Sequence, residues 1–347
     1  MKDAGQLLRL SLPTSLFSSS SKSSDPGRKA QESTELVRLR IEQVGFAGKK
    51  TIWSSCLKDV SDANLVLTND EQVLLKGGAT KAQLENARKA LDDLAGALKN
   101  QDPVGTLKLQ TVAADRVYDL RAASLPKRTL PYSLPDDDSL AGLPLLKGRA
   151  TVKMVIERKG GSRAGEFVLD DGSKSATLPL RMVVDGYRAP VTAGNFVDLI
   201  SSKKYTNVPV ESTDELFVVV EEPRVAGAPP PRSIPLELFY KNDKQPTYHY
   251  SSDDDNRATE TFSDPFQAKG AIGMLHSPED NDDADTKFFF LNWKQAFVAP
   301  GRNTLDGSSA CFGYVLENQD ALEQIKKGDV IREAVVTEGM ENFVKGK

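Results

Sequence analysis

Cysteine and histidine are scarce in this chain of 347 residues, which holds two of each: Cys56, Cys311, His249 and His276. No CxxC pair and no Cys/His spacing typical of a metal site occurs, so the sequence predicts neither a metal nor a cofactor. Neither histidine belongs to a Ser/Asp or Cys pattern that would support nucleophilic catalysis. We expect the cysteines to be two separate buried thiols, with a disulfide between them as the alternative.

Long hydrophobic runs and a strong net charge are also missing. No apolar run reaches the roughly 18 residues that a membrane-spanning helix needs. Residues 1–13 are too few and too polar for a secretory signal, so we expect any targeting peptide to have been removed or never to have been present. The net charge of −4 gives no electrostatic reason to expect a nucleic-acid partner. Peripheral association with a membrane stays open.

The first third of the chain has helical periodicity. Residues 1–27 are predicted to form an N-terminal extension with a serine-rich stretch at 18–27, and residues 28–124 to form a helical bundle. Thr80 and Gln83 have the spacing of a capping box, which predicts the start of a helix. Asp102 and Pro103 predict the start of another. The first of these helices carries one apolar stripe, formed by Leu84, Ala87, Leu91, Leu94 and Leu98.

Prolines and three consecutive aspartates make residues 125–146 a predicted linker, because such a segment cannot form a long helix. Residues 147–347 then show short apolar or alternating runs between turn signals, with two short helices at 190–203 and 319–325. This pattern predicts a closed antiparallel barrel plugged by helices. The expected fold class is therefore α+β, with an N-terminal helical bundle followed by a closed antiparallel β-barrel with capping helices. The predicted strands are 150–157, 178–184, 217–220, 271–275, 287–291, 310–315 and 329–336.

Six segments of the second region, taken in order, resemble the conserved blocks of the cyclophilin-type prolyl isomerases. The resemblance covers about residues 147–338 and implies a cyclophilin-like barrel. Within that family, residues 2–13 and 143–150 resemble the large thylakoid-lumen cyclophilins of plants and algae, which carry a helical domain before the barrel. The six segments are Ala189–Phe196, Phe217–Val219, Gly270–Met274, Phe288–Leu291, Leu305–Gly313 and Gly328–Ile331.

The same resemblance implies a location and a role. It implies the chloroplast thylakoid lumen and a function in the assembly or maintenance of photosynthetic membrane complexes. The ligands it implies are proline-containing segments of partner proteins, with subunits of photosynthetic complexes as candidates.

The resemblance also implies a pocket for the proline ring, and the residues that match it are apolar: Phe217, Met274, Phe289 and Leu305. The polar positions of the family are replaced. Thr213 stands at the position of the catalytic arginine, in a predicted loop at 210–216. The other replaced positions are Val220 and Lys287 for two glutamines, His276 for an asparagine, Thr304 for a tryptophan and Ser309 for a histidine.

A prolyl isomerase must lower a rotation barrier of about 18–20 kcal/mol. A threonine hydroxyl at position 213 cannot supply the fixed, charged donor fork of a guanidinium. Losing one preorganised donor typically lowers a rate by about 10² to 10³. Lys287 is the best candidate for a substitute donor, with Arg224 and Arg232 as others.

Three functions follow as hypotheses. The leading one is a binding or assembly factor that uses the apolar pocket or the helical domain. The alternative is an active or weakly active peptidyl-prolyl cis-trans isomerase that assists protein folding. In the third, the helical domain covers the barrel face until a partner arrives.

Two further motifs have both a functional and a plain interpretation. Residues 279–285 resemble a calcium loop but lack its sixth-position glycine, so a solvated acidic loop is favoured. Residues 228–232 contain three prolines that could form a polyproline II ligand, although a stiff loop is favoured.

Overall fold

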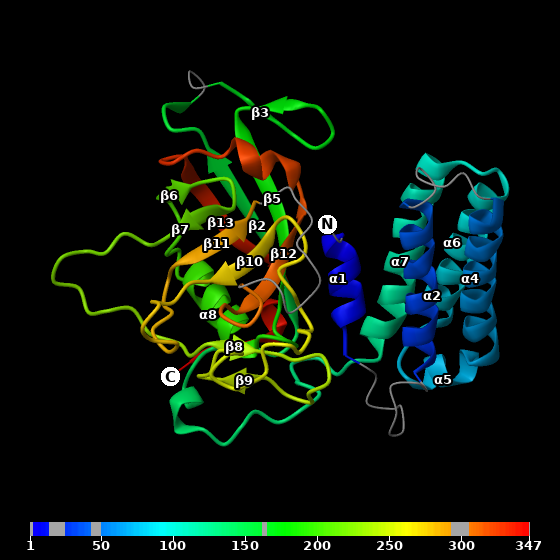
Figure 1. Cartoon of the computed structure of the whole chain (residues 1–347), viewed down its shortest axis with the longest axis horizontal. Coiled ribbons are helices and arrows are strands. Elements are labelled where there is room, and N and C mark those ends of the chain that lie inside the picture. The colour runs from blue at the N-terminus through cyan, green and yellow to red at the C-terminus, as the bar shows by residue number, and fades with distance from the viewer. Residues whose placement is uncertain (1–2, 14–24, 43–49, 162–164, 293–304, 347) are drawn as a thin grey trace. The chain divides into compact units, whose positions relative to one another are not determined.

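The structure is a computed structural model that describes residues 3–13, 25–42, 50–161, 165–292 and 305–346. The chain forms two compact units (Figure 1), one from Arg9 to Pro126 and the other from Met1–Leu8 together with Lys127–Lys347. We call them the helical unit and the barrel unit. The first eight residues, which the sequence placed in an N-terminal extension, therefore group with the barrel unit.

The helical unit is a bundle, as the apolar periodicity predicted. Thr80 accepts a hydrogen bond from the backbone of Gln83, whose side chain returns one to the Thr80 backbone, so the capping box is confirmed. The predicted apolar stripe behind it is buried. The serine-rich stretch falls mainly in residues 14–24, outside the described residues. The helices are α1 (Ala4–Ser11, which enters this unit at Arg9), α2 (Pro26–Glu42), α4 (Lys50–Asn69), α5 (Glu71–Lys76), α6 (Lys81–Lys99) and α7 (Pro103–Ala123).

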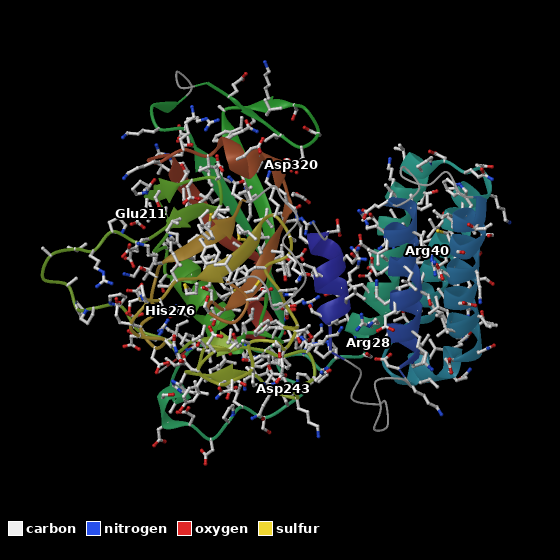
Figure 2. All side chains as sticks on the ribbon, in the orientation of Figure 1. Arg28, Arg40, Glu211, Asp243, His276 and Asp320 are labelled. Carbon is white, nitrogen blue, oxygen red and sulfur yellow. The ribbon has the colours of Figure 1, made fainter. Side chains whose placement is uncertain are left out.

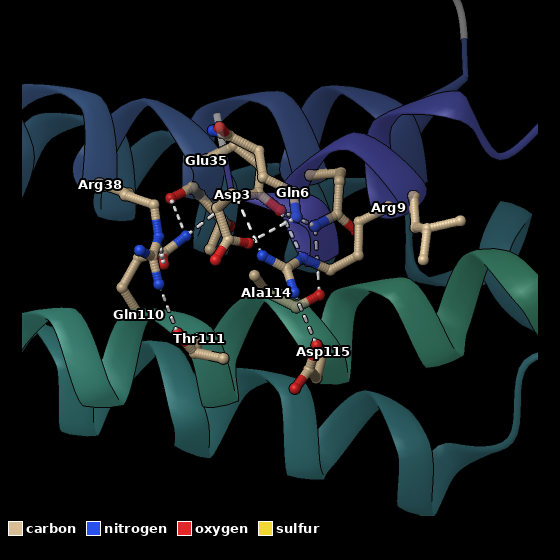
Figure 3. A network of polar contacts seen from close by, with 12 residues as sticks. Asp3, Gln6, Arg9, Glu35, Arg38, Gln110, Thr111, Ala114 and Asp115 are labelled. Atoms are coloured by element: carbon tan, nitrogen blue, oxygen red, sulfur yellow. Dashed lines mark hydrogen bonds and ion pairs between the residues drawn. The ribbon is translucent and has the colours of Figure 1, made fainter. Parts of the chain in front are cut away.

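A buried polar network lies where the end of α1 meets α2 and α7 (Figure 3). The Arg9 guanidinium donates to Glu35 at 2.6 Å and to Asp115 at 3.0 Å. Gln31 and Gln110 donate their side-chain amides to the two oxygens of the same Glu35 carboxylate, at 3.0 and 3.1 Å. Because Glu35 is only 2% exposed, these donors replace the water that its charge would otherwise need.

Replacing Glu35 with alanine should destabilise the helical unit by about 3 kcal/mol, because it leaves the buried Arg9 without its main counter-charge. Urea unfolding of the full chain, followed by circular dichroism at 222 nm, measures this change. Glu32→Ala is the matched control, since Glu32 pairs with Arg28 at the surface, where ion pairs contribute about 0–1 kcal/mol. Equal loss of stability in the two variants would show that the network contributes nothing.

Eight strands close the barrel in the order β10-β11-β7-β6-β13-β2-β5-β12, each antiparallel to its neighbours. The predicted closed antiparallel barrel is therefore confirmed. The strands are β2 (Arg149–Glu157), β5 (Thr177–Asp185), β6 (Val208–Thr213), β7 (Phe217–Val220), β10 (Ala271–Met274), β11 (Phe288–Leu291), β12 (Cys311–Glu317) and β13 (Val330–Glu338).

One strand of the barrel was missed: residues 208–213 form β6, so the segment predicted as a loop at 210–216 begins as a strand. The predicted helix at 190–203 is α8 (Pro190–Ser201), and the one at 319–325 is the 3₁₀ helix η4 (Asp320–Gln324). The smaller elements are η2 (Asp138–Leu140), η5 (Met340–Asn342) and the strand pairs β1 (Leu145–Leu146) with β14 (Phe343–Val344), β3 (Phe167–Val168) with β4 (Lys174–Ser175), and β8 (Glu237–Leu238) with β9 (Thr247–Tyr248).

The barrel interior is filled by alternate residues of its strands and by α8. Phe196 of α8 packs its ring against Phe288 of β11 and Phe312 of β12, with both centroid distances 5.1 Å. On β2 the inward residues Val152, Met154 and Ile156 are fully buried, as the alternation of that segment requires. The helix thus plugs the barrel with apolar side chains.

A second apolar layer lies on the outer face of five adjacent strands. We call it the outer apolar layer. Ala4, Leu7 and Leu8 of α1 belong to it, and Arg149 of β2 donates to the Leu8 carbonyl at 2.7 Å. It also includes Val183, Phe217, Val219, Phe266, Ala268, Ala271, Leu275, Phe289, Leu291, Leu305, Cys311, Tyr314 and Leu316.

Both cysteines are free thiols, so the disulfide alternative is wrong. Cys56 is buried in the core of the helical unit, and Cys311 lies half-buried in the outer apolar layer. Burial raises the pKa of Cys56 to about 11 and that of Cys311 well above its usual value. Neither thiol therefore forms a thiolate readily at neutral pH.

Candidate functional site

The structure brings together three of the four residues predicted to line a proline pocket. Phe217, Phe289 and Leu305 all belong to the outer apolar layer, and the rings of Phe217 and Phe289 pack edge to face with centroids 5.0 Å apart. Met274 does not join them, because its side chain belongs to the core of the barrel interior. The candidate site is thus the part of the outer face formed by β7, β11 and the segment that begins at Leu305.

Phe289 is fully buried at this site. The Phe266 ring stacks on it with centroids 5.5 Å apart, and the Phe266 backbone N–H donates to Asp306 at 2.7 Å. The Tyr314 hydroxyl donates to the Pro265 carbonyl at 2.9 Å, which holds the same segment against the barrel. Side chains of the chain itself therefore surround Phe289, and the half-buried Phe217 and Leu305 are the more accessible members.

Thr213, which the sequence analysis predicted to stand in place of the family's arginine, carries no charge. Thr213 is the last residue of β6, opposite Val218 of β7, and is half-buried. The turn that follows is held by Asp214, whose carboxylate accepts from the backbone N–H groups of Leu216 and Phe217 at 2.7 Å each. The nearest charge in the sequence is therefore negative. A carboxylate cannot stabilise the lone pair that localises on a prolyl nitrogen as its amide twists, whereas a cationic donor can.

Val220 and Ser309 are the residues that the sequence analysis predicted to replace a glutamine and a histidine. Val220 lies on the face of β7 opposite to Phe217 and is fully buried in the barrel interior. A glutamine at this position would place its amide among apolar side chains. Ser309 is 8% exposed, and its backbone forms an isolated β-bridge with that of Asp306.

Lys287, the candidate substitute donor, is already paired. Its ammonium lies 2.9 Å from Glu211 of β6 and 3.0 Å from Glu221 after β7. Partial burial acts to lower the pKa of Lys287, but the hydrogen bonds and charges of the two carboxylates outweigh it, so the pKa is raised. Lys287 therefore stays charged, with its donors directed to Glu211 and Glu221. Figure 2 labels Glu211 on this part of the barrel.

The other two candidate cations are engaged as well. Arg224 pairs with Asp285 at 2.8 Å, and Arg232 pairs with Asp198 at 2.8 Å while also donating to Asn195. Each of the three predicted substitute donors thus forms an ion pair with a carboxylate of the chain itself.

His276 follows β10 and is labelled in Figure 2. Its two ring nitrogens lie 2.7 Å from the carbonyl oxygen of Ser277 and 2.6 Å from that of Ser308. The ring thus connects the end of β10 to the segment that carries Leu305. Thr304 lies outside the described residues.

A small polar cavity of about 20 Å³ adjoins the site, which is enough room for about one water. The buried Glu237 on its wall accepts from the N–H groups of Val191 and Thr192 at the start of α8 and from the Tyr248 hydroxyl, while burial raises the pKa of Glu237. The sequence analysis missed this residue, although a glutamate between two leucines in Leu236-Glu237-Leu238 was a signal. The wall also includes Arg188, Phe239, Phe262, Asp264, Phe266, Asp306, Gly307, Ser309 and Cys311.

Within the described ranges, no three His, Cys, Asp or Glu side chains converge in a way that could hold a metal ion. In the acidic loop at 279–285, Asp283 accepts from the Ser277 backbone at 2.7 Å and Asp285 pairs with Arg224. The carboxylates of Asp283 and Asp285 therefore already have partners within the chain.

Comparison with known proteins places the chain in a family. The family described as cyclophilin type peptidyl-prolyl cis-trans isomerase/CLD matches residues 175–342. A putative thylakoid lumen peptidyl-prolyl cis-trans isomerase (sll0408) of Synechocystis sp. is 31% identical over 336 residues, covering 91% of this chain and 81% of that protein. The chain therefore belongs to the cyclophilin-type peptidyl-prolyl isomerase family, as its sequence blocks predicted.

Two plant relatives are also similar over most of the chain. The chloroplastic peptidyl-prolyl cis-trans isomerase CYP38 of Arabidopsis thaliana is 28% identical, covering 99% of this chain and 75% of that protein. CYP37 of the same plant is 27% identical, covering 90% of this chain and 68% of that protein. The described helices include none long and apolar enough to cross a membrane.

Gly273 of β10 gives the Phe289 ring its room, because a Cβ at this position would overlap that ring and lie 2.8 Å from the ring of Phe266. Gly273→Ala should therefore destabilise the barrel unit by about 1–3 kcal/mol, the usual cost of overpacking a core. Denaturant unfolding monitored by near-UV circular dichroism measures this effect.

The control is Gly96→Ala, since Gly96 of α6 has open space where the new Cβ would lie. This variant should be neutral or stabilising by up to about 1 kcal/mol, because alanine favours helix over glycine. If Gly273→Ala were equally harmless, the close packing of Phe289 would be refuted.

Proposed function

We propose that this protein is a binding or assembly factor of the thylakoid lumen that holds proline-containing or extended segments of photosynthetic membrane proteins. The observation that supports the proposal best is the combination of a retained apolar cluster with cations that are all engaged. Phe217, Phe289 and Leu305 cluster on the outer face, whereas Lys287 is held between two glutamates. The names of the relatives, which place them in the thylakoid lumen or chloroplast, support the location.

The chemistry of the site favours binding over turnover. Isomerisation needs a preorganised donor at the twisting prolyl amide, and a charged donor is about twice as strong as a neutral one. The Thr213 hydroxyl is neutral, and the nearby carboxylates of Asp214, Glu211 and Glu221 attract any cation that approaches. An apolar face, by contrast, can still bury a proline ring without a catalytic donor.

Weak prolyl isomerisation is the second candidate function, favoured by the place of Lys287. Lys287 lies two positions before Phe289, just before β11 begins, so it is the cation closest in sequence to that ring. If a ligand displaced Glu211 or Glu221 from Lys287, the ammonium could donate to the ligand instead. This activity would assist protein folding.

The first test measures prolyl isomerisation of a short Ala-Pro peptide by the full chain. We expect a rate at least about 10² below that of a single-domain cyclophilin with the complete polar set, because one charged donor is missing. Thr213→Arg should raise the rate, whereas Thr337→Arg, the same change at an exposed position of β13, should not. A wild-type rate equal to that of the complete enzyme would contradict the loss of chemistry.

The second test measures binding of a fluorescent Ala-Pro peptide to the full chain by anisotropy. Phe217→Ala should weaken binding about tenfold or more, equivalent to about 1.4 kcal/mol, because Phe217 is an accessible aromatic residue of the cluster. Phe343→Ala is the matched control, a half-buried phenylalanine on β14. Unchanged affinity in Phe217→Ala, or an equal loss in both variants, would refute binding at this face.

A further inference from the structure

His249 joins two segments of the barrel unit that are far apart in the sequence. Its Nε2 lies 2.9 Å from the Asp137 carboxylate and 3.1 Å from the Ser139 hydroxyl, next to η2. Its Nδ1 lies 2.8 Å from the carboxylate of Asp282, in the loop between β10 and β11. The imidazole therefore lies between two carboxylates that approach it from opposite ring nitrogens.

The backbone fixes the position of the ring. His249 has a φ of 73°, a left-handed conformation that is uncommon for any residue other than glycine. Its N–H donates to the Leu236 carbonyl at 3.0 Å, and its carbonyl accepts from the Asn281 side chain at 3.0 Å. These two bonds hold the residue in an unfavourable backbone conformation, so the side chain is directed between the carboxylates before any proton binds.

The number of donors on the ring depends on its protonation. A neutral imidazole has one N–H and one lone pair, so it can donate to only one of the two carboxylates. When Nδ1 donates to Asp282, Nε2 faces an Asp137 oxygen that also carries lone pairs. The Ser139 hydroxyl does not fill the gap, because it donates its one proton to Asp137 at 2.6 Å. A protonated imidazole donates from both nitrogens and places a positive charge between two negative ones. Proton binding thus converts one attachment into two.

We propose that His249 is a proton-operated clamp, which holds the Asp137–Ser139 turn and the β10–β11 loop together when its ring is charged and releases one of them when the ring is neutral. The clamp does not depend on the proposed function. The clamp nevertheless acts on a segment that borders the candidate site, because the β10–β11 loop runs from near His276 to Lys287.

The groups around His249 support this assignment. Hydrogen bonds donated by Ser139 and His249 lower the pKa of Asp137 to about 2. Hydrogen bonds donated by Ser251 and Asn281 lower the pKa of Asp254, and the bond from Asn281 connects Asp254 to the β10–β11 loop. On the same loop Asp280 accepts from the Asp282 backbone. Asp137 and Asp254 therefore keep their charge across the pH range in which a histidine ordinarily titrates.

A raised pKa is consistent with the geometry. Partial burial acts to lower the pKa of His249, but the hydrogen bonds that its ring donates to the Asp282 and Asp137 carboxylates outweigh it, so the pKa is raised. The contribution of the clamp to stability is therefore fully present below the unfolded-state pKa of about 6.5 and is lost as the pH rises through the folded-state value. The buried Glu237, bonded to the neighbouring Tyr248, also has a raised pKa, so the test must observe the histidine ring directly.

The test is an NMR titration of the imidazole resonances of the full chain between pH 4.5 and 8.5. The chain has only two histidines, so His249→Asn assigns the signals, and asparagine tolerates a left-handed backbone. We expect the His249 midpoint to lie above that of a histidine in a short peptide. Asp137→Asn and Asp282→Asn should each lower it, whereas Asp136→Asn, an exposed neighbour of Asp137, should shift it much less.

Hydrogen exchange of residues 277–285, corrected for the intrinsic effect of pH, measures the release. Protection in the wild type should fall as the pH rises through the His249 midpoint, and in His249→Asn it should not follow that midpoint. The clamp is refuted if the midpoint equals that of the short peptide, if neither aspartate variant lowers it, or if the loop shows the same protection on both sides of it. A variant that fails to fold would be replaced by Asp137→Ser or Asp282→Ser.

Discussion

Apolar residues on both faces of the same strands are the constraint on which the barrel unit depends. Alternate residues of β7 and β11 point inward and outward, and both sets are apolar. The inward set packs around α8, while the outward set needs another cover. Residues 4–8, the segment around Phe266 and the segment from Leu305 belong to the layer that buries it. The outer face of the barrel is therefore a second core, and the candidate site is an edge of that core.

The three candidate cations among the described residues all have carboxylate partners. Lys287, Arg224 and Arg232 are each paired with carboxylates of the chain. Exposed pairs of this kind contribute little to stability, about 0–1 kcal/mol. Their larger effect is on chemistry, because a cation whose charge is already balanced by carboxylates is a weaker electrostatic partner for a ligand amide. The apolar cluster of Phe217, Phe289 and Leu305 is thus accompanied by candidate cations that each already have a carboxylate partner.

Local signals predicted what depends on local structure. The capping box at Thr80 and the alternation of β2 are set by neighbouring residues, and both are present as predicted. β6 was missed because it contains Pro209 and polar residues, and because its partners β7 and β13 supply the pairing.

Contacts between residues far apart in the sequence could not be predicted from local sequence patterns. All four residues of β10 are buried, so alternation could not show that Met274 faces the interior. Arg9 and Glu35 are 26 residues apart, and His249 and Asp137 are 112 apart. No local periodicity connects such pairs, because the contact exists only once the fold has formed.

The stacking of Phe266 on Phe289 has a consequence for recognition. A ligand that needs the Phe289 ring must bind a conformation in which Phe266 has moved away. Its apparent affinity is then the intrinsic affinity multiplied by the population of that open conformation. The Phe266 ring therefore competes with a ligand for the Phe289 ring. A ligand of high affinity must form enough contacts elsewhere on the protein to offset the displacement of Phe266.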